Sequence, residues 1–183
     1  MKKLLFLAIL CLFPFQAQAA CDISKKNVKA ISQQIINKNY AQNSFRMKKP
    51  SLIVSNKKVE GYDAEELGGT ITIYAKSLDD LYCDQYFDGL TPYLTEIVNH
   101  EYVHAMDEEL GLSKKIGEKK MSENTAYIGE HVLKNTLWPE SFVSRELKPN
   151  ETKKYATLQN IFQAKSRLQV AKTKKQTSFT HKK

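Results

Sequence analysis

Two histidines four residues apart, with a glutamate directly after the first, are the residues of this chain best suited to chemistry. They form the run His100-Glu101-Tyr102-Val103-His104. On a helix, positions i and i+4 lie on one face, so both imidazoles can reach one metal ion at about 2.0–2.1 Å, the distance of zinc ligands. Glu101 would lie beside the ion without binding it, where it can take a proton from a metal-bound water. The run therefore predicts a zinc centre with Glu101 as general base.

A catalytic zinc site usually has three protein ligands and one open position, so a third ligand must come from elsewhere in the chain. The nearby acids are Asp107 and Glu108, on the same helix, and Glu123, which is separated from His104 by eighteen intervening residues. A residue one turn past the pair would complete a tetrahedron only if the helix bent, whereas a second helix can deliver Glu123 from another direction. We therefore predict that His100, His104 and Glu123 bind one Zn²⁺ per chain. Asp107 is better suited to support a ligand imidazole.

This set resembles the gluzincin zinc peptidases, in which an HExxH run is followed by a glutamate ligand. The segment Ser122-Glu123-Asn124-Thr125-Ala126-Tyr127 is similar to that family's Asn-Glu-x-x-Ala stretch, and the likeness covers about residues 91–135. It implies hydrolysis of peptide bonds in a peptide or protein substrate. It also implies an α+β, zincin-like fold: a small mixed β-sheet with a backing helix, an active-site helix and a glutamate helix. On that fold, the strand at 70–74 would be the edge that pairs with an extended substrate.

The chain also departs from the gluzincin pattern. Many members carry an aspartate four residues after the glutamate ligand, but that position is Tyr127 here. No Gly-Ala-Met-Glu-Asn exopeptidase motif precedes the histidines, so aminopeptidase specificity is not implied. The large C-terminal domain that supplies a tyrosine or histidine to the transition state has no counterpart in these residues. Tyr127, His131 and Tyr155 are the available substitutes, and the sequence does not choose among them.

Hydrophobic periodicity predicts the elements that precede the histidine pair. An amphipathic helix is expected over 22–42, where apolar residues recur at helical spacing. Short strands are expected at 51–55 and 59–62, and the alternation of Thr and Ile at 70–74 predicts a half-buried strand. The acidic and aromatic segment 79–89 is interpreted as a loop.

The histidine pair itself lies in a predicted helix that runs from Thr91, its expected N-cap, to Leu110 and stops at Gly111. A basic connector at 113–120 follows. Ser122 is the expected N-cap of the glutamate helix, which should end near residue 135, and one more helix is predicted over 151–172.

The first nineteen residues have the pattern of a signal peptide. A positively charged start is followed by an apolar run at 4–15 and by Ala17-Gln18-Ala19, the small-x-small pattern of a cleavage site. The run is too short to span a bilayer comfortably, and no later segment is apolar enough. We therefore predict an exported protein, periplasmic or secreted, with no transmembrane anchor in the mature chain. The metallopeptidase domain is expected to span 20–172.

Cys21 and Cys83 are the two cysteines that would remain after signal removal. An even count in an exported protein favours a disulfide, so we predict that these two residues are bridged. A lipid on Cys21 is the alternative. It is disfavoured because Gln18 stands where lipoprotein signals usually have a Leu-like residue.

The net charge of +8 comes mainly from the C-terminal region. Residues 148–183 carry ten Lys or Arg and a single acid, Glu151, whereas residues 20–147 carry sixteen basic and nineteen acidic groups. A near-neutral body does not predict a nucleic-acid partner. The tail at 173–183 is polar and basic and is expected to be a disordered, solvated end, with a weak contact to anionic surfaces as the alternative.

Two other function classes stay open. The chain could be a non-catalytic binding protein of the cell envelope that keeps the zincin scaffold, but such a protein has no use for the carboxylate of Glu101. It could also be a surface-binding protein whose function lies in the basic tail, in which case deletion of 173–183 would abolish that function.

Overall fold

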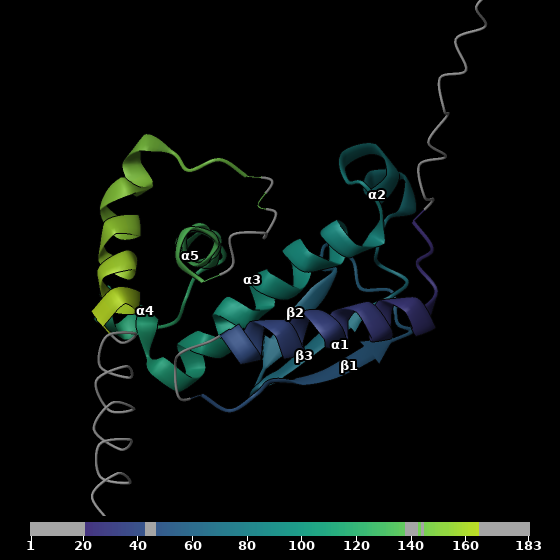
Figure 1. Ribbon diagram of the computed structural model, residues 1–183, viewed down its shortest axis with the longest axis horizontal. Helices are drawn as coiled ribbons and strands as arrows, with labels where there is room; N and C mark the ends of the chain where they lie inside the picture. The colour runs from purple at the N-terminus through teal and green to yellow at the C-terminus, as the bar shows by residue number, and fades with distance from the viewer. Residues whose placement is uncertain (1–20, 43–46, 138–142, 144, 165–183) are drawn as a thin grey trace, which may run out of the picture.

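Three short strands form one mixed sheet in the part of the chain that the computed structural model describes, residues 21–42, 47–137, 143 and 145–164 (Figure 1). Strand β1 (Ser51–Ser55) runs parallel to β3 (Thr70–Tyr74), and β2 (Ala64–Leu67) runs antiparallel to β3 on its other side. The predicted alternation of β3 is confirmed, because Ile71 and Ile73 are fully buried while Thr70 and Thr72 are only partly buried.

Two sequence-based expectations for the sheet are wrong. The second strand is not at 59–62 but at Ala64–Leu67, and it reaches β3 through Gly68 and Gly69, whose positive φ angles of 61° and 74° suit a two-residue hairpin turn. In addition, β3 is the central strand, in the order β1-β3-β2, so it cannot be the edge that accepts a substrate strand. The edge strands are β1 and β2.

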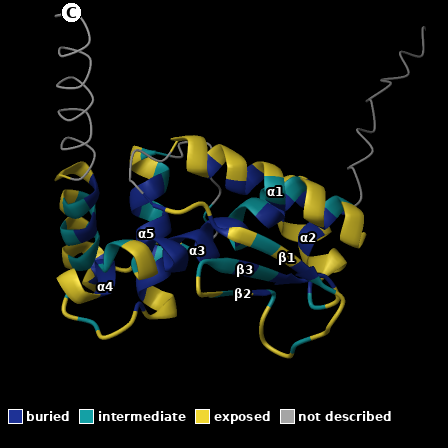
Figure 2. Ribbon diagram, turned by 90° about the horizontal axis from the view of Figure 1, so that it is seen from below, coloured by how far each residue is buried: buried dark blue, intermediate teal, exposed yellow. Residues whose placement is uncertain are grey.

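Helices α1 (Lys25–Gln42) and α3 (Leu90–Leu110) cover one face of this sheet (Figures 1 and 2). Both turn an apolar stripe inward, which includes Val28 and Ile36 of α1 and Leu94 and Val98 of α3. Among the described residues no helix covers the opposite sheet face, and Ile53 on that face is 53% exposed. Helix α3 begins at Leu90, with Gly89 rather than the expected Thr91 at the N-cap, and ends as predicted at Gly111, in the left-handed conformation.

Helix α5 (Glu123–Thr136) packs against α3 from the side away from the sheet (Figure 1). Ser122 is its N-cap, as predicted: the side-chain oxygen accepts a hydrogen bond from the backbone N–H of Thr125. The basic connector before it contains the short helix α4 (Leu112–Lys115). A 3₁₀ helix η1 (Pro149–Glu151) leads into a helical segment at 152–164. The signal peptide, the expected helical continuation at 165–172 and the basic tail lie outside the described residues.

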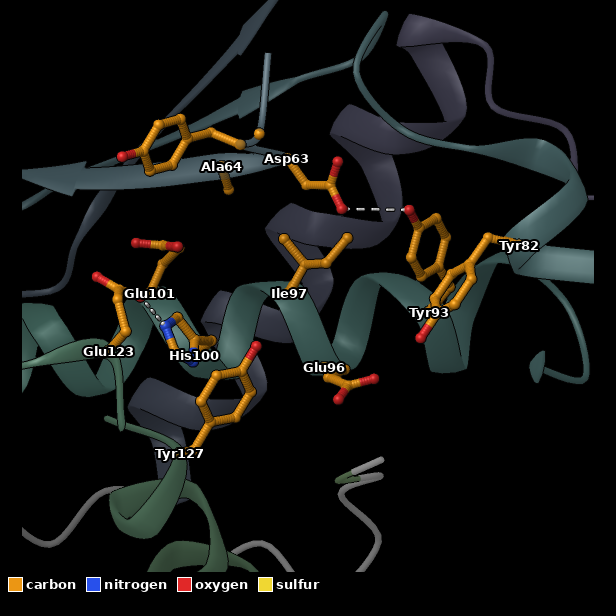
Figure 3. A pocket seen from close by; sticks show the side chains of 12 residues that line it. Asp63, Ala64, Tyr82, Tyr93, Glu96, Ile97, His100, Glu101, Glu123 and Tyr127 are labelled. Carbon is orange, nitrogen blue, oxygen red and sulfur yellow. Dashed lines mark hydrogen bonds and ion pairs between the residues drawn. The ribbon is translucent and has the colours of Figure 1, made fainter. Parts of the chain in front are cut away.

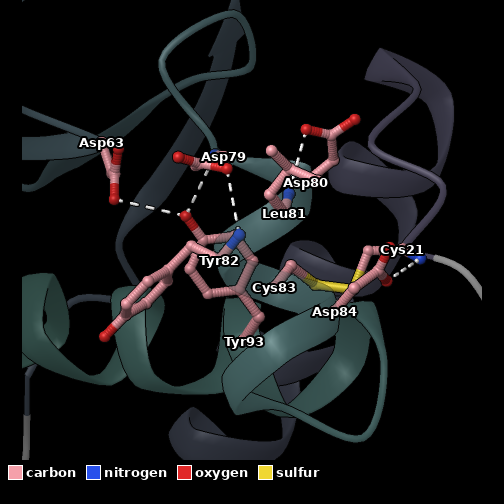
Figure 4. Close-up of a disulfide and its surroundings, with 9 residues drawn as sticks. All are labelled: Cys21, Asp63, Asp79, Asp80, Leu81, Tyr82, Cys83, Asp84 and Tyr93. Atoms are coloured by element: carbon pink, nitrogen blue, oxygen red, sulfur yellow. Dashed lines mark hydrogen bonds between the residues drawn. A yellow bond between two sulfur atoms is a disulfide. The ribbon is translucent and has the colours of Figure 1, made fainter.

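The segment interpreted from sequence as a loop contains helix α2 (Asp80–Tyr86) instead. It forms because the Asp79 side chain accepts from the backbone N–H of Tyr82 and so caps the first turn. The predicted disulfide is confirmed: Cys83 of α2 is bonded to Cys21, with their Cα atoms 6.1 Å apart (Figure 4). The Cys21 backbone N–H also donates to the Asp84 carboxylate at 2.8 Å. The start of the described chain is therefore tied to α2.

The described residues thus form an α+β fold with a small mixed sheet and several helices. Among them, no helix combines the length and the apolar character that a membrane span requires.

Candidate metal centre

His100 and His104 lie one turn apart in the middle of α3, on the face that α5 covers. Both are buried, at 8% and 9% exposed, and their ring centroids are 5.1 Å apart. Their Nε2 atoms are directed toward the same carboxylate, that of Glu123. The helical spacing that the sequence predicted therefore brings the two imidazoles to one point.

Glu123 reaches this point from the first turn of α5, as the sequence argument required. Its Oε2 lies 2.8 Å from His100 Nε2, and its Oε1 lies 3.6 Å from His104 Nε2. One ligand atom from each of the three side chains falls within 4.8 Å of the others. The Glu123 side chain is 75% exposed, so the group is open toward solvent on one side. This set could hold a metal ion, because two imidazole nitrogens and one carboxylate oxygen converge with one side left accessible.

A glycine allows α5 to approach α3 this closely. A Cβ atom built on Gly129 would lie 2.7 Å from Val103 Cγ1, closer than side-chain atoms pack. Val103 lies within the HExxH run, and Gly129 lies between Glu123 and Glu130 on α5. The missing side chain thus sets the distance between the two helices that carry the candidate ligands.

Glu130, which the sequence analysis did not single out, is the partner of the other nitrogen of His100. Its Oε1 lies 2.6 Å from His100 Nδ1, and its side chain is 1% exposed. Because Nδ1 is engaged there, Nε2 is left to face Glu123 and a metal ion. The signal was available: Glu130 lies seven residues after Glu123, two turns along the same helix face. The gluzincin pattern draws attention to the position four residues after Glu123, which is Tyr127 in this chain.

The charges of His100, Glu123 and Glu130 affect one another's pKa values. Burial by itself would lower the pKa of His100, but its hydrogen bonds to Glu123 and Glu130 raise that pKa to about 10. The same hydrogen bond to His100 lowers the pKa of Glu123 to about 2. Burial raises the pKa of Glu130 to about 7, against the opposing effect of His100. A protonated His100 therefore donates its Nδ1–H to Glu130 and its Nε2–H to Glu123, so the two carboxylates favour positive charge at this ring.

Glu101 lines the cleft next to the candidate ligands and is 8% exposed. Burial is the main reason that its pKa is raised to about 7, and the charge of Glu123 adds to that rise. Figure 3 shows its carboxylate on the cleft side of α3, near that of Glu123. A carboxylate with a pKa near neutrality, beside a group that could hold a metal, is suited to accept and return a proton.

The other side chains named from the sequence have different neighbours. The Asp107 carboxylate accepts from the backbone N–H groups of Ser113 and Met121, so it holds the connector between α3 and α5. Glu108 accepts from the backbone N–H of Gly68 at 3.3 Å. Asp107 and Glu108 therefore have structural roles at the C-terminal end of α3.

His131 and Tyr155 also make contacts away from the ligand group. His131 Nε2 lies 2.6 Å from the backbone oxygen of Arg145, and the Tyr155 hydroxyl accepts from the Asn135 side chain at 3.0 Å. Of the possible transition-state groups, only Tyr127 lies against the site: its ring centroid is 4.5 Å from that of His100.

Arg145, which the sequence analysis also missed, packs on Tyr127. Its guanidinium carbon lies 5.5 Å from the centroid of the tyrosine ring, a cation–π arrangement. The guanidinium is held by hydrogen bonds to Asn124 and to Glu151. Tyr127 is thus enclosed between Arg145 and His100, which limits the positions its hydroxyl can take.

A cleft of about 260 Å³ opens beside the ligand group (Figure 3). It is bordered by the start of β2 at Ala64, by α3 at Ile97, by α5 at Tyr127 and by α2 at Tyr82. His100, Glu101 and Glu123 lie at one end of it. The candidate metal centre is therefore reached from a space large enough for part of a peptide.

Comparison of the chain with protein-family models, with curated proteins and with solved structures finds no match. The resemblance to gluzincins accordingly depends on the residues of the chain alone.

Proposed function

We propose that this chain is an exported, zinc-dependent metallopeptidase of the gluzincin type. The observation that carries the proposal is the convergence of His100, His104 and Glu123 at one end of a cleft, with Glu101 beside them. A purely structural metal site is usually closed by four protein ligands, whereas this set has three and an accessible side. An accessible position next to a buried carboxylate supports catalysis over a structural role.

Zinc is the metal that this donor set supports best. Two neutral imidazoles and one carboxylate also suit iron or other divalent transition metals, but the i, i+4 histidine pair with an intervening glutamate is the arrangement of zinc hydrolases. When bound, zinc would supply a Lewis acid that polarises a carbonyl and lowers the pKa of a coordinated water to about 7.

The roles of the side chains follow from their contacts. Glu101 accepts a proton at the floor of the cleft and returns it to the leaving amine. Glu130 fixes the ring of His100 through Nδ1. Tyr127, whose ring is held between His100 and Arg145, lines the cleft beside the ligands and supports the developing oxyanion.

The edge strand β2 supports a peptide as substrate. Ala64 at its start borders the cleft, and β2 pairs only on one side within the described sheet. An extended peptide could add to its other side by backbone hydrogen bonds. The disulfide fits the proposed export, because such bonds persist in oxidising compartments.

The test is hydrolysis of a mixed peptide library by the zinc-loaded mature chain and by Glu101→Gln. Glutamine is nearly isosteric but cannot accept the proton, so the rate should fall at least 10²–10⁴-fold, the contribution of general acid–base catalysis, while zinc stays bound. Glu109→Gln is the matched control, because Glu109 is an exposed glutamate on the same helix.

Full activity in Glu101→Gln would contradict the mechanism. Zinc binding by the native chain without hydrolysis of any peptide would instead favour the non-catalytic envelope protein that keeps the same scaffold.

A further inference from the structure

The first turn of α5 carries the candidate ligand Glu123 and is open to solvent. Ser122, Glu123 and Asn124 are all exposed. Helix ends fray readily, because the first backbone N–H groups have no partner within the helix. A metal ligand at this position therefore depends on whatever else holds the turn in place.

The C-terminal segment at 145–164 holds α5 from outside the ligand group. It lies on the side of α5 that faces away from α3, in green and yellow in Figure 1. Leu158 and Phe162 of this segment are buried in the hydrophobic core, so the segment is anchored independently of α5. Its Tyr155 hydroxyl accepts from Asn135, near the end of α5.

Lys154 connects this segment to the first turn of α5 through a compact polar network. Its Nζ lies 2.6 Å from Glu118 Oε1 and 3.0 Å from Thr125 Oγ1. The Thr125 hydroxyl donates to Glu118 at 2.8 Å, and Glu118 Oε2 accepts from the backbone N–H of Ser122 at 3.3 Å. The network thus contacts the N-cap and the third residue of the helix, on either side of Glu123.

The pair of Glu118 and Lys154 is partly buried and charged. Their side chains are 21% and 33% exposed. Burial by itself would raise the pKa of Glu118, but its hydrogen bonds from Lys154 and Thr125 lower that pKa below its usual value. Loss of the Lys154 ammonium would therefore leave a partly buried carboxylate without its cation, which weakens the whole network.

Arg145 makes a second connection to the same turn. Its Nη2 donates to the Asn124 side chain at 2.6 Å and also to Glu151. Asn124 follows Glu123 directly, so the C-terminal segment contacts the ligand's neighbour in the chain as well as its cap. Arg145 also packs on Tyr127, whereas the hydrogen bonds of Lys154 within the described residues go only to Glu118 and Thr125.

We propose that Lys154 and Arg145 are positioning residues of the candidate metal centre: they hold the first turn of α5 against fraying and so keep the Glu123 carboxylate at the histidine pair. The inference rests on the metal centre of the proposed function but not on peptide hydrolysis. It makes zinc affinity depend on a segment that supplies no candidate ligand.

The test is zinc affinity, measured by competition with a chelator, in chains that differ at residue 154. Lys154→Met removes the charge, and zinc affinity should fall about tenfold, the lower end of the range for residues that support metal ligands. Lys154→Arg keeps a cation within reach of Glu118 and should restore most of the affinity. Lys153→Met is the matched control, because Lys153 is an exposed neighbour on the same helical segment, and it should bind zinc as the native chain does.

Asn124→Ala tests the second connection. It removes the acceptor of Arg145 and leaves the contact of Arg145 with Tyr127 in place, so zinc affinity should fall a few-fold.

A double-mutant cycle shows whether Lys154 acts through Glu123. In the Glu123→Ala background, where the ligand is already absent, adding Lys154→Met should not weaken zinc binding further. A second loss of similar size in that background would overturn the inference, because it would show a general effect on the fold. A lower free energy of unfolding in Lys154→Met, with native zinc affinity, would overturn it as well and leave Lys154 a structural role only.

The inference and the proposed function fail in different ways. Zinc affinity that depends on Lys154, in a chain that cleaves no peptide, would uphold the positioning role and overturn the peptidase. Hydrolysis by the native chain, with native zinc affinity in both Lys154→Met and Asn124→Ala, would uphold the peptidase and overturn the positioning role.

Discussion

The two ends of the cleft are held together in different ways. At one end, the ligand cluster, which consists of the candidate ligands His100, His104 and Glu123 with Glu130 beside them, joins α3 to α5 by close packing and charged hydrogen bonds. At the other, α2 is tied to the first described residue by the Cys21–Cys83 disulfide. The first arrangement fixes the positions of side chains, while the second fixes a chain segment. We infer that disturbing one end should change metal binding and that disturbing the other should change stability.

The largest expected effect is on stability at the disulfide end. Replacing both cysteines, as Cys21→Ser/Cys83→Ser, releases a link between residues 62 positions apart. In the chain-entropy model this lowers the free energy of unfolding by about 4 kcal/mol. Denaturant unfolding measures the loss, and metal affinity below the transition should stay as in the native chain. A comparable loss of metal affinity would show that the two ends are coupled.

The next effect concerns the ligand cluster. Glu130→Gln keeps the size of the side chain but removes the charge that faces His100 Nδ1, so metal affinity should fall about 10–100-fold, as for other partners of ligand histidines. Competition with a zinc chelator measures the affinity, and Glu109→Gln is the control on α3. If Glu130→Gln binds zinc as tightly as the native chain, Glu130 has only a packing role.

The smallest effect tests the helix contact that sets the ligand distance. Gly129→Ala would bring a methyl group to 2.7 Å from Val103 Cγ1. Overpacking costs about 1–3 kcal/mol, and the better helix propensity of alanine returns about 1 kcal/mol. We therefore expect a net loss of about 1 kcal/mol and a few-fold weaker metal binding. Adding Val103→Ala makes room for the methyl group, and metal affinity should recover in the double variant.

The ligand cluster was predictable where the signals are local. The i, i+4 spacing of His100 and His104, the cap at Ser122 and the stop at Gly111 each follow from a short stretch of sequence, and the structure agrees with all three. The spacing of Glu130, two turns past Glu123 on the same helix face, is visible in the sequence, but its contact with His100 depends on how α5 is rotated against α3.

The other end of the cleft was less predictable because its elements lack clear local sequence signals. Strand β2 has the sequence Ala-Glu-Glu-Leu, which lacks the β-branched residues that mark a strand. Helix α2 depends on the cap at Asp79 within a segment whose composition resembles a loop. Asp63 and Glu96 are far apart in sequence and line one cleft because β2 and α3 pack together.

The central claim is that His100, His104 and Glu123 bind one zinc ion, and zinc content per chain tests it most directly. Mature protein loaded with zinc and then freed of excess metal should hold about one zinc per chain, and so should Glu101→Gln. His100→Ala and Glu123→Ala each remove a ligand and should hold far less under the same conditions. Native zinc content in both of these variants would contradict the assignment of the site.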